Sequence, residues 1–386
     1  MKNKKITLIC LTGLCVGLSL AGLTACRGSQ NLVQEYAIVD AFESISIATE
    51  TADITIHKSA DDTCKVVTSD QEDLRHTVGV QDGILTVKLE DTRKWYQFIQ
   101  FHVEETSIAI YLPETEYKNL VIDESTGDIG VVGFQFENVD ISLSTGDVEL
   151  YDSTTENLKI KTSTGNIKAE NTSAKSMDLS ASTGDIHLLT ATAEDITLTV
   201  TTGKMDLQNV TCTNLTTSGD TGTLNIGTVH AAGTVTVERT TGDVALNDVT
   251  AGGLNITTST GNINVTKAIC GDVQLAVSTG KTTLTDMTCV SLTSTGDTGK
   301  LTMNNVVASG KFTLERTTGD ITFNGCDATE LEVNATTGDV EGTLLSDKVF
   351  IVRASTGKIK VPETVTGGTC KITTTTGDII IEIKSN

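Results

Sequence analysis

Residues 142–150 read SLSTGDVEL, and near copies of this stretch stand 19 residues before it and 19 residues after it. The earlier copy is ESTGDIG at 124–130, and the later copy is TSTGNIK at 162–168. Along the chain a Thr-Gly pair returns every 19 or 20 residues, which is typical of a solenoid built from one turn per repeat. The glycines of these pairs are Gly127, Gly146, Gly165, Gly184, Gly203, Gly222, Gly242, Gly261, Gly280, Gly299, Gly319, Gly338, Gly357 and Gly377.

The residues on both sides of each glycine alternate between apolar and polar. Around Gly146, for example, Val139, Ile141, Val148 and Leu150 are apolar and the positions between them are mostly polar. Such alternation predicts strands that bury one face. One repeat cannot bury that face alone, whereas stacked repeats bury a continuous ladder. We therefore predict an all-β, single-stranded parallel β-solenoid of about 14 rungs, and crossover statistics favour a right-handed coil.

The Ser-Thr-Gly-Asp motif itself is explained by the corner between two inward-facing strands. Glycine supplies the positive φ that other residues resist, and the hydroxyl groups of Ser and Thr can bond the turn backbone. Asp or Asn after the glycine suits a corner that faces water. The motif thus predicts a structural corner once per rung and requires no chemistry of its own.

The start of the chain has the composition of a secretory leader. Lys2, Lys4 and Lys5 form a basic head, and residues 6–22 are apolar and small. The following Leu-Thr-Ala-Cys ends at Cys26 and resembles the lipobox of bacterial lipoproteins. That resemblance implies that Cys26 carries a diacylglycerol, which would anchor the chain to a lipid bilayer outside the cytoplasm.

The domain organisation that we expect follows from these boundaries. Residues 1–25 are the lipoprotein signal peptide, 26–38 the lipidated cysteine and a tether, 39–118 an irregular β N-terminal cap, and 119–386 the repeat solenoid. Within the cap, Asp-Ile-Thr-Ile at 53–56 resembles a degenerate rung.

Both ends of the predicted solenoid offer surfaces for partners. RKWYQFIQF at 93–101 is the largest aromatic cluster, and it is either the core of the cap or a platform for a partner or glycan. At the other end, Ile379, Ile381 and Ile383 form a last strand with no cap after it. An open strand edge of this kind pairs with other chains, so we expect end-to-end association of this C-terminal rung with another copy or a partner.

Composition excludes several classes of function. The chain of 386 residues has a formal charge of −22, which argues against nucleic-acid binding because nothing would neutralise the phosphates. No CxxC pair or Cys/His cluster is present, so we expect no metal site and no cofactor. Cys270 and Cys289 fall at the same phase of consecutive rungs, where a ladder of buried free thiols is favoured over a disulfide.

A longer period of 77 residues lies over the short one, since VERTTGDV at 237–244 returns as LERTTGDI at 314–321. Arg239 and Arg316 then occupy the inward phase nearest the corner. We expect both arginines to form local salt bridges at the rim of the solenoid. The alternative is that they bind a ligand.

Three stretches resemble a known family. Phe-x-x-Ile-x-Ile at 42–47, Asp-Ile-Thr-Ile at 53–56 and IAIYLP at 108–113 precede the STGD repeats. Together they resemble the bacterial putative-adhesin family of β-strand-repeat proteins from the cell envelope, over about residues 40–386. The resemblance implies a β-repeat fold. It supplies no functional residue, because that family is largely of unknown function.

These features favour a non-enzymatic, membrane-anchored extracellular surface lipoprotein that acts as an adhesin or structural rod, with a glycan or protein ligand on its surface. The alternative is an envelope-stress sensing or signalling module that binds a peptide or partner protein. A carbohydrate-active β-helix enzyme is disfavoured, because no catalytic residues are apparent. The histidines lack triad partners in the sequence, and they are His57, His76, His102, His187 and His230.

Calcium at the Gly-Asp corners is also disfavoured. One Asp per rung supplies fewer than the six to eight oxygen ligands that Ca²⁺ takes. In addition, lysine replaces the Asp after the glycine at Lys204, Lys281 and Lys358.

Overall fold

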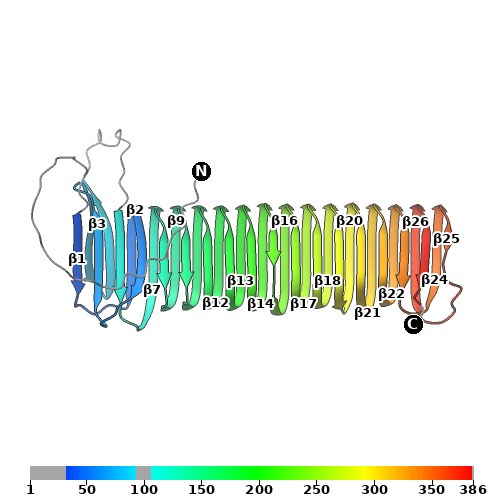
Figure 1. Ribbon diagram of the computed structural model, residues 1–386, viewed down its shortest axis with the longest axis horizontal. Coiled ribbons are helices and arrows are strands. Elements are labelled where there is room, and N and C mark those ends of the chain that lie inside the picture. The colour runs from blue at the N-terminus through cyan, green and yellow to red at the C-terminus, as the bar shows by residue number, and fades with distance from the viewer. Residues whose placement is uncertain (1–31, 93–105, 385–386) are drawn as a thin grey trace, which may run out of the picture. The chain divides into compact units, whose positions relative to one another are not determined.

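The rungs expected from the sequence are present in the structure, a computed structural model that describes residues 32–92 and 106–384. Within these residues the chain has 27 strands in one continuous sheet and no helix. Parallel strands stack rung upon rung, which confirms a β-solenoid of about 14 turns (Figure 1). The hand of the coil stays a prediction.

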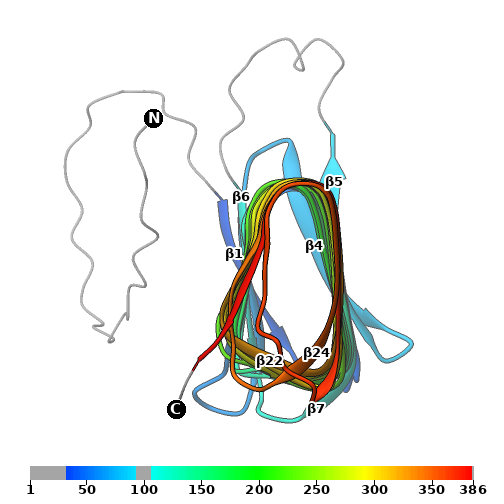
Figure 2. The same ribbon diagram turned by 90° about the vertical axis from the view of Figure 1, so that its right-hand side faces the viewer.

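Equivalent positions of successive repeats lie beside one another in parallel register. Leu158 pairs with Val139 of the preceding rung and with Met177 of the following one. Apolar side chains therefore stack on apolar side chains, and they form one buried core that runs through the stack. Figure 2 looks along the stack and shows the rungs superposed around this common interior.

The first corner of each rung is the Thr-Gly pair. All fourteen of its glycines have φ between 134° and 155°. A Cβ atom on Gly203 would lie 1.9 Å from the carbonyl oxygen of Gly184 on the preceding rung. Glycine is therefore required both by the backbone conformation and by the close approach of the rung beside it.

A second corner lies six residues after the first, where the sequence suggested only a loose return. The residue there adopts the left-handed conformation, with φ between 50° and 61° in eight rungs. Asn and Asp tolerate this conformation best, and they occupy six of the eight positions. The eight residues are Asp152, Asn171, Thr190, Asn209, Asp248, Lys267, Asp286 and Asn305.

A strand begins two residues after the corner glycine and, where the second corner does not interrupt it, continues to the threonine before the next corner glycine, as in β12. The first strands of the stack are β7 (Glu116–Thr126), β8 (Ile129–Val132), β9 (Gln135–Thr145), β10 (Val148–Tyr151), β11 (Thr154–Thr164), β12 (Ile167–Thr183), β13 (Ile186–Thr202), β14 (Met205–Thr221) and β15 (Leu224–Ile226). They are followed by β16 (Val229–Thr241), β17 (Val244–Thr260), β18 (Ile263–Thr279), β19 (Thr282–Cys289), β20 (Ser291–Thr298), β21 (Leu301–Thr318), β22 (Ile321–Thr337) and β23 (Val340–Leu344).

The N-terminal region contains a regular rung as well as irregular strands. In β2 (Ser44–Lys58), Ile47 pairs with Ile122 and Ile54 pairs with Ile129, so β2 continues the stack beyond the first Thr-Gly corner. Residues 53–56 thus form the degenerate rung that their sequence resembles. The strands beyond β2 are β3 (Cys64–Asp70), β4 (Leu74–Gln81), β5 (Ile84–Asp91) and β6 (Thr106–Leu112).

Antiparallel pairing closes this end. β5 and β6 run parallel to β2, whereas β4 pairs with β5 and β3 pairs with β6 in antiparallel register. The expected tether over 26–38 is wrong for its last seven residues, because β1 (Leu32–Ile38) pairs antiparallel with β3. Tyr36 and Ile38 of β1 pack against the core, which gives this segment a face to bury.

Several predicted features lie outside the described residues. They are the signal peptide over 1–25, the lipidation site Cys26 and the aromatic cluster over 93–101.

The C-terminal rungs do not stack in the order of the chain, and this corrects the expected open end. The last rung, β26 (Gly368–Thr376) with β27 (Ile379–Ile383), lies between β22 with β23 and β24 (Lys348–Thr356) with β25 (Ile359–Lys360). Among the described residues β24 pairs only with β26. The edge therefore belongs to residues 348–360 and not to the final strand.

The close approach at the Thr-Gly corner gives a first prediction. Gly203→Ala should lower the free energy of unfolding by roughly 2–3 kcal/mol, because its Cβ would enter the space of the Gly184 carbonyl and φ is positive. Gly79→Ala is the matched control, since a Cβ there meets nothing within 4 Å. Urea unfolding followed by circular dichroism measures both, and equal stabilities for the two variants would contradict the corner model.

Candidate functional site

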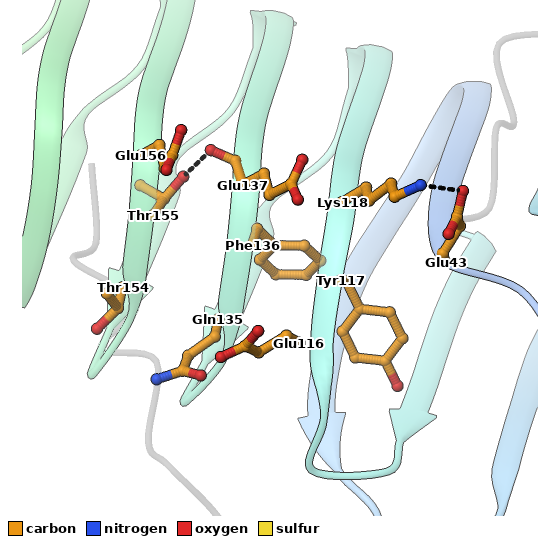
Figure 3. A pocket seen from close by; sticks show the side chains of 10 residues that line it. All are labelled: Glu43, Glu116, Tyr117, Lys118, Gln135, Phe136, Glu137, Thr154, Thr155 and Glu156. Atoms are coloured by element: carbon orange, nitrogen blue, oxygen red, sulfur yellow. Dashed lines mark hydrogen bonds and ion pairs between the residues drawn. The ribbon is translucent and has the colours of Figure 1, made fainter.

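A shallow groove lies where the first rungs of the stack meet the N-terminal region (Figure 3). Its volume is about 470 Å³. Successive rungs contribute equivalent residues from β7, β9 and β11, and the segment before β2 closes one end. The lining residues are Glu43, Glu116, Tyr117, Lys118, Gln135, Phe136, Glu137, Thr154, Thr155 and Glu156.

The floor of the groove is aromatic and buried. The ring of Tyr117 stacks on Phe42 with centroids 5.9 Å apart and lies 5.7 Å from the ring of Phe136. The hydroxyl of Tyr117 donates a hydrogen bond to the carbonyl of Pro113 at 3.0 Å, and burial raises the pKa of this hydroxyl to about 12. These rings therefore form the floor of the groove without offering an open aromatic face.

The rim of the groove is acidic. Glu116, Glu137 and Glu156 are exposed and stand on neighbouring rungs. The one lysine in the lining, Lys118, forms an ion pair with Glu43 at 2.6 Å. The groove therefore presents a negative surface that suits cationic or hydrogen-bond-donating ligands.

A ladder of asparagine side chains keeps this face in register. The Asn138 amide donates to the Asn119 carbonyl oxygen at 2.9 Å, and the Asn157 amide donates to Asn138 at 2.8 Å. Each bond links adjacent rungs beside the groove, so the spacing of the three carboxylates on its rim is fixed by the solenoid.

The corner carboxylates form a second ladder and serve the backbone. Asp128 accepts a hydrogen bond from the N–H of Asp147 at 2.9 Å, and Asp147 accepts one from the N–H of Asn166 at 2.7 Å. At Lys204 the N–H donates to Asp185 at 2.7 Å, but the lysine side chain offers no acceptor to the next rung. The described residues contain no group of three potential metal ligands.

One histidine has partners that the sequence did not reveal. His76 lies between Asp70, whose carboxylate is 2.6 Å from Nδ1, and Thr49, whose hydroxyl is 2.9 Å from Nε2. The expectation that no histidine has triad partners is therefore wrong in geometry. However, His76 and Asp70 are buried, and the second oxygen of Asp70 accepts bonds from Thr68 and from the His76 backbone. We interpret the trio as a buried polar network that joins β2, β3 and β4.

The two arginines of the 77-residue period point into the solenoid, as expected from their phase. Arg239 is 3% exposed and Arg316 is 2% exposed. The expected salt bridges at the rim are wrong, since neither arginine forms an ion pair with any described acidic residue. Their inward direction removes them from the exposed carboxylates of Glu238 and Glu315.

The buried cysteines of the described residues are free thiols. Cys270 and Cys289 lie on consecutive rungs, and burial raises the pKa of the first to about 11 and of the second to about 12. At neutral pH they are therefore protonated thiols that pack as small apolar groups.

Glu124 is a buried acid that the sequence reading missed. It occupies the same inward position, three residues before the corner glycine, that Arg239 holds further along the stack. One carboxylate oxygen accepts hydrogen bonds from the N–H groups of Ala52 and Thr126, both at 3.2 Å. Burial raises the pKa of this carboxyl to about 7. The sequence did contain a sign of this buried acid, because Glu124 stands at a position of the repeat that points inward.

The groove was missed for a different reason. Its rim combines equivalent positions of three repeats, which only the stacking brings together. A partial signal was present in GFQFEN at 133–138, where two phenylalanines stand in a segment otherwise poor in aromatic residues.

The fold and the repeated corners define a β-solenoid repeat protein. The family model described as Toastrack DUF4097 matches residues 42–204, 189–285 and 266–386. These matches span most of the chain, so the protein belongs to the Toastrack DUF4097 family. Membership confirms the resemblance to adhesin-type β-repeat proteins stated above.

Solved structures and curated proteins add little beyond the family. A putative adhesin from Parabacteroides merdae is 15% identical, with 67% of this chain and 95% of that chain covered and a TM-score of 0.34. A putative adhesin from Bacteroides fragilis is 12% identical, with 92% and 98% covered and a TM-score of 0.23. No curated protein matches the chain. Within the described residues, no helix is long and apolar enough to cross a membrane.

The raised pKa of Glu124 predicts how stability changes with pH. The folded state keeps this proton up to about pH 7, whereas an unfolded glutamate releases it near 4.5. The stability gained from the protonated form is therefore complete below pH 4.5 and lost as pH rises through 7. Glu124→Gln should match the wild type at pH 4.5 and exceed it by roughly 2–3 kcal/mol at pH 8.

Thermal and urea unfolding from pH 4.5 to 8 measure this difference, with the exposed Glu137→Gln as control. Parallel pH profiles for Glu124→Gln and the wild type would show that the buried carboxyl does not titrate in this range.

Proposed function

We propose that the protein is a non-enzymatic surface lipoprotein, anchored outside the cytoplasmic membrane through Cys26, that binds a ligand through the acidic groove. The solenoid holds that groove at a fixed place on a rigid stack. The lipobox-like sequence supports the anchor and the extracytoplasmic location.

The proposal rests on one observation: most repeated polar side chains are bonded within the protein, whereas the carboxylates of the groove are exposed. Along the corners the Asp and Asn side chains bind the backbone of the next rung, so the most frequent acid in the repeat is structural. The buried trio of Thr49, His76 and Asp70 is likewise committed to internal bonds. Exposed carboxylates of Glu116, Glu137 and Glu156 line the groove instead.

The charge of the groove favours a cationic ligand, and we propose a protein partner that presents a segment rich in Lys or Arg. An adhesin would find that partner on another cell. The alternative role, sensing or signalling within the cell's own envelope, would use the same groove for a peptide or a partner lipoprotein.

Binding of the purified protein to intact cells, host glycoproteins and cell-wall glycans tests the proposal. Saturable binding should weaken about tenfold when Glu116, Glu137 and Glu156 are changed together to Gln, and it should weaken with added salt. A control changes the exposed Asp178, Glu238 and Glu330 to their amides, which removes the same charge away from the groove.

Binding that survives the groove substitutions would place the ligand elsewhere on the stack. Absence of binding to every surface tested, with the fold confirmed by circular dichroism, would contradict the adhesive role and favour a partner inside the envelope.

The open C-terminal edge supports a second proposal, the end-to-end association of two copies. Ile351 is 57% exposed on β24, and Phe350, Val352 and Ala354 are only partly buried beside it. The loop after β25 contacts one end of β24 through Thr364, which donates to the carbonyl of Lys348.

Charge favours a head-to-tail arrangement. Residues 348–360 contain four basic side chains and no acidic one; Lys348 is buried in an ion pair with Asp327 and Lys360 pairs with Glu382, which leaves Arg353 and Lys358. Residues 32–92 contain 13 acidic and 4 basic residues. We therefore propose that the edge formed by β24 and β25 docks on the N-terminal strands of a second copy.

Sedimentation velocity over a range of protein concentrations measures this association. Ile351→Lys should leave the protein monomeric, because it adds a charge to the apolar part of the edge. Ile269→Lys is the matched control, since Ile269 is 63% exposed in the middle of the stack and should leave association unchanged. A wild type that stays monomeric at every concentration would exclude the docking.

A further inference from the structure

Unsatisfied polar atoms gather at one level of the solenoid interior. In the described residues, seven buried side-chain nitrogen or oxygen atoms lack a hydrogen-bond partner. Five of the seven belong to three residues: Nε, Nη1 and Nη2 of Arg239, and the hydroxyl oxygens of Thr217 and Thr258. These side chains are 3%, 0% and 1% exposed.

The three residues stand on three consecutive rungs. Arg239 pairs with Gly219 of the preceding rung and with Thr258 of the following one, and Thr217 lies two residues before Gly219. Gly219 makes the room for the arginine, because a Cβ on it would lie only 1.8 Å from Nη1 of Arg239. In this cluster the Arg239 side chain lies over Gly219, and the preceding and following rungs contribute the hydroxyls of Thr217 and Thr258.

The second copy of the pattern, 77 residues later, provides an internal comparison. Arg316 lies over Gly296 in the same way, and its guanidinium donates to the Ser294 carbonyl at 3.1 Å and to the Glu315 carbonyl at 2.7 Å. It also donates to the hydroxyls of Ser294 at 3.0 Å and Thr282 at 3.4 Å. Protein oxygens therefore accept hydrogen bonds from Nη1 and Nη2 of this buried cation, whereas its Nε lacks a partner.

One substitution between the copies removes one of the four hydrogen-bond acceptors. Position 282, where Thr accepts a bond from Arg316, is position 205 in the first copy, and Met205 has no comparable acceptor there. The first copy instead places Thr258 where the second has Ala335. Arg239 has therefore lost an acceptor and gained a hydroxyl neighbour that lacks a partner.

The positive charge and the unpaired donors of this cluster determine which ligand it can bind. A guanidinium stays charged in proteins and has donors only, while threonine hydroxyls can also donate. A buried cation with no counterion is strongly disfavoured. Water would supply acceptors but would leave the charge uncompensated. A small anion supplies both the negative charge and an acceptor for several N–H and O–H groups.

We propose that Arg239, with the hydroxyls of Thr217 and Thr258, binds a small monovalent anion of the halide class inside the solenoid, and that Arg316 binds none. Chloride is the anion of this size available to an extracytoplasmic protein. It would act as a structural ligand of the stack, separate from the groove and independent of any adhesive role.

Thermal unfolding of the full-length protein in different sodium salts at equal ionic strength tests the proposal. Chloride and bromide should raise the midpoint by about 2–4 °C relative to methanesulfonate, a larger anion. The protein is unfolded and refolded in each salt, so that a buried ion can exchange. Arg239→Met should abolish the halide-specific shift, and Arg316→Met should retain it.

Crystals grown in bromide provide a direct readout that does not depend on the variants folding. An anomalous peak beside the guanidinium of Arg239, and none beside Arg316, is the expected result. Equal midpoints of the wild type in chloride and methanesulfonate, a halide shift that persists in Arg239→Met, or an Arg239 site filled by water without anomalous signal would each overturn the proposal.

Discussion

The approach of one backbone to the next at the Thr-Gly corner is the constraint on which the rest of the structure depends. The carbonyl of Gly184 stands where the next rung's corner residue would carry its Cβ, and the same contact recurs along the stack. The corner therefore fixes the start of every rung, and variation in repeat length must be absorbed elsewhere. It is absorbed between the second corner and the next Thr-Gly corner, where the register shifts between Ala231 and Thr234 and between Ala308 and Lys311, within repeats of 20 residues.

The corner also determines which polar residues of the repeat bond the backbone and which remain available at the surface. Because each corner is superposed on the previous one, the side chain after the glycine lies within reach of the next backbone N–H, and Asp147 and Asn166 use their oxygens there. Lys204 and Lys281 accept nothing and interrupt the ladder at little cost, since the glycine contact persists. Surface chemistry is consequently left to faces away from the corner, where Glu137 and its neighbours are not needed by the backbone.

Local features of the fold could be predicted from the sequence, whereas features that join distant or equivalent segments could not. The period and the alternation define each rung, and the inward phase of Arg239 and Arg316 follows from counting residues from the glycine. The partners of His76 come from separate strands of an irregular region, which no period predicts. The order of β24 and β26 is equally hidden, because both carry the same pattern and either would fit as the outer rung. The groove needed the stacking of three repeats before its carboxylates could be recognised as neighbours.

A chain of nearly identical rungs faces a difficulty of its own, since stacking in the wrong order costs little when every rung presents the same surface. The paired Gly219 and Arg239 counter this, because the guanidinium has room beside a glycine and none beside Val200, which holds the same inward position one rung earlier. Gly296 and Arg316 repeat the device. Beyond Arg316 that inward position carries only the small residues Ala335, Ala354 and Thr374. It is in this part of the chain that the spatial order departs from the order of the sequence.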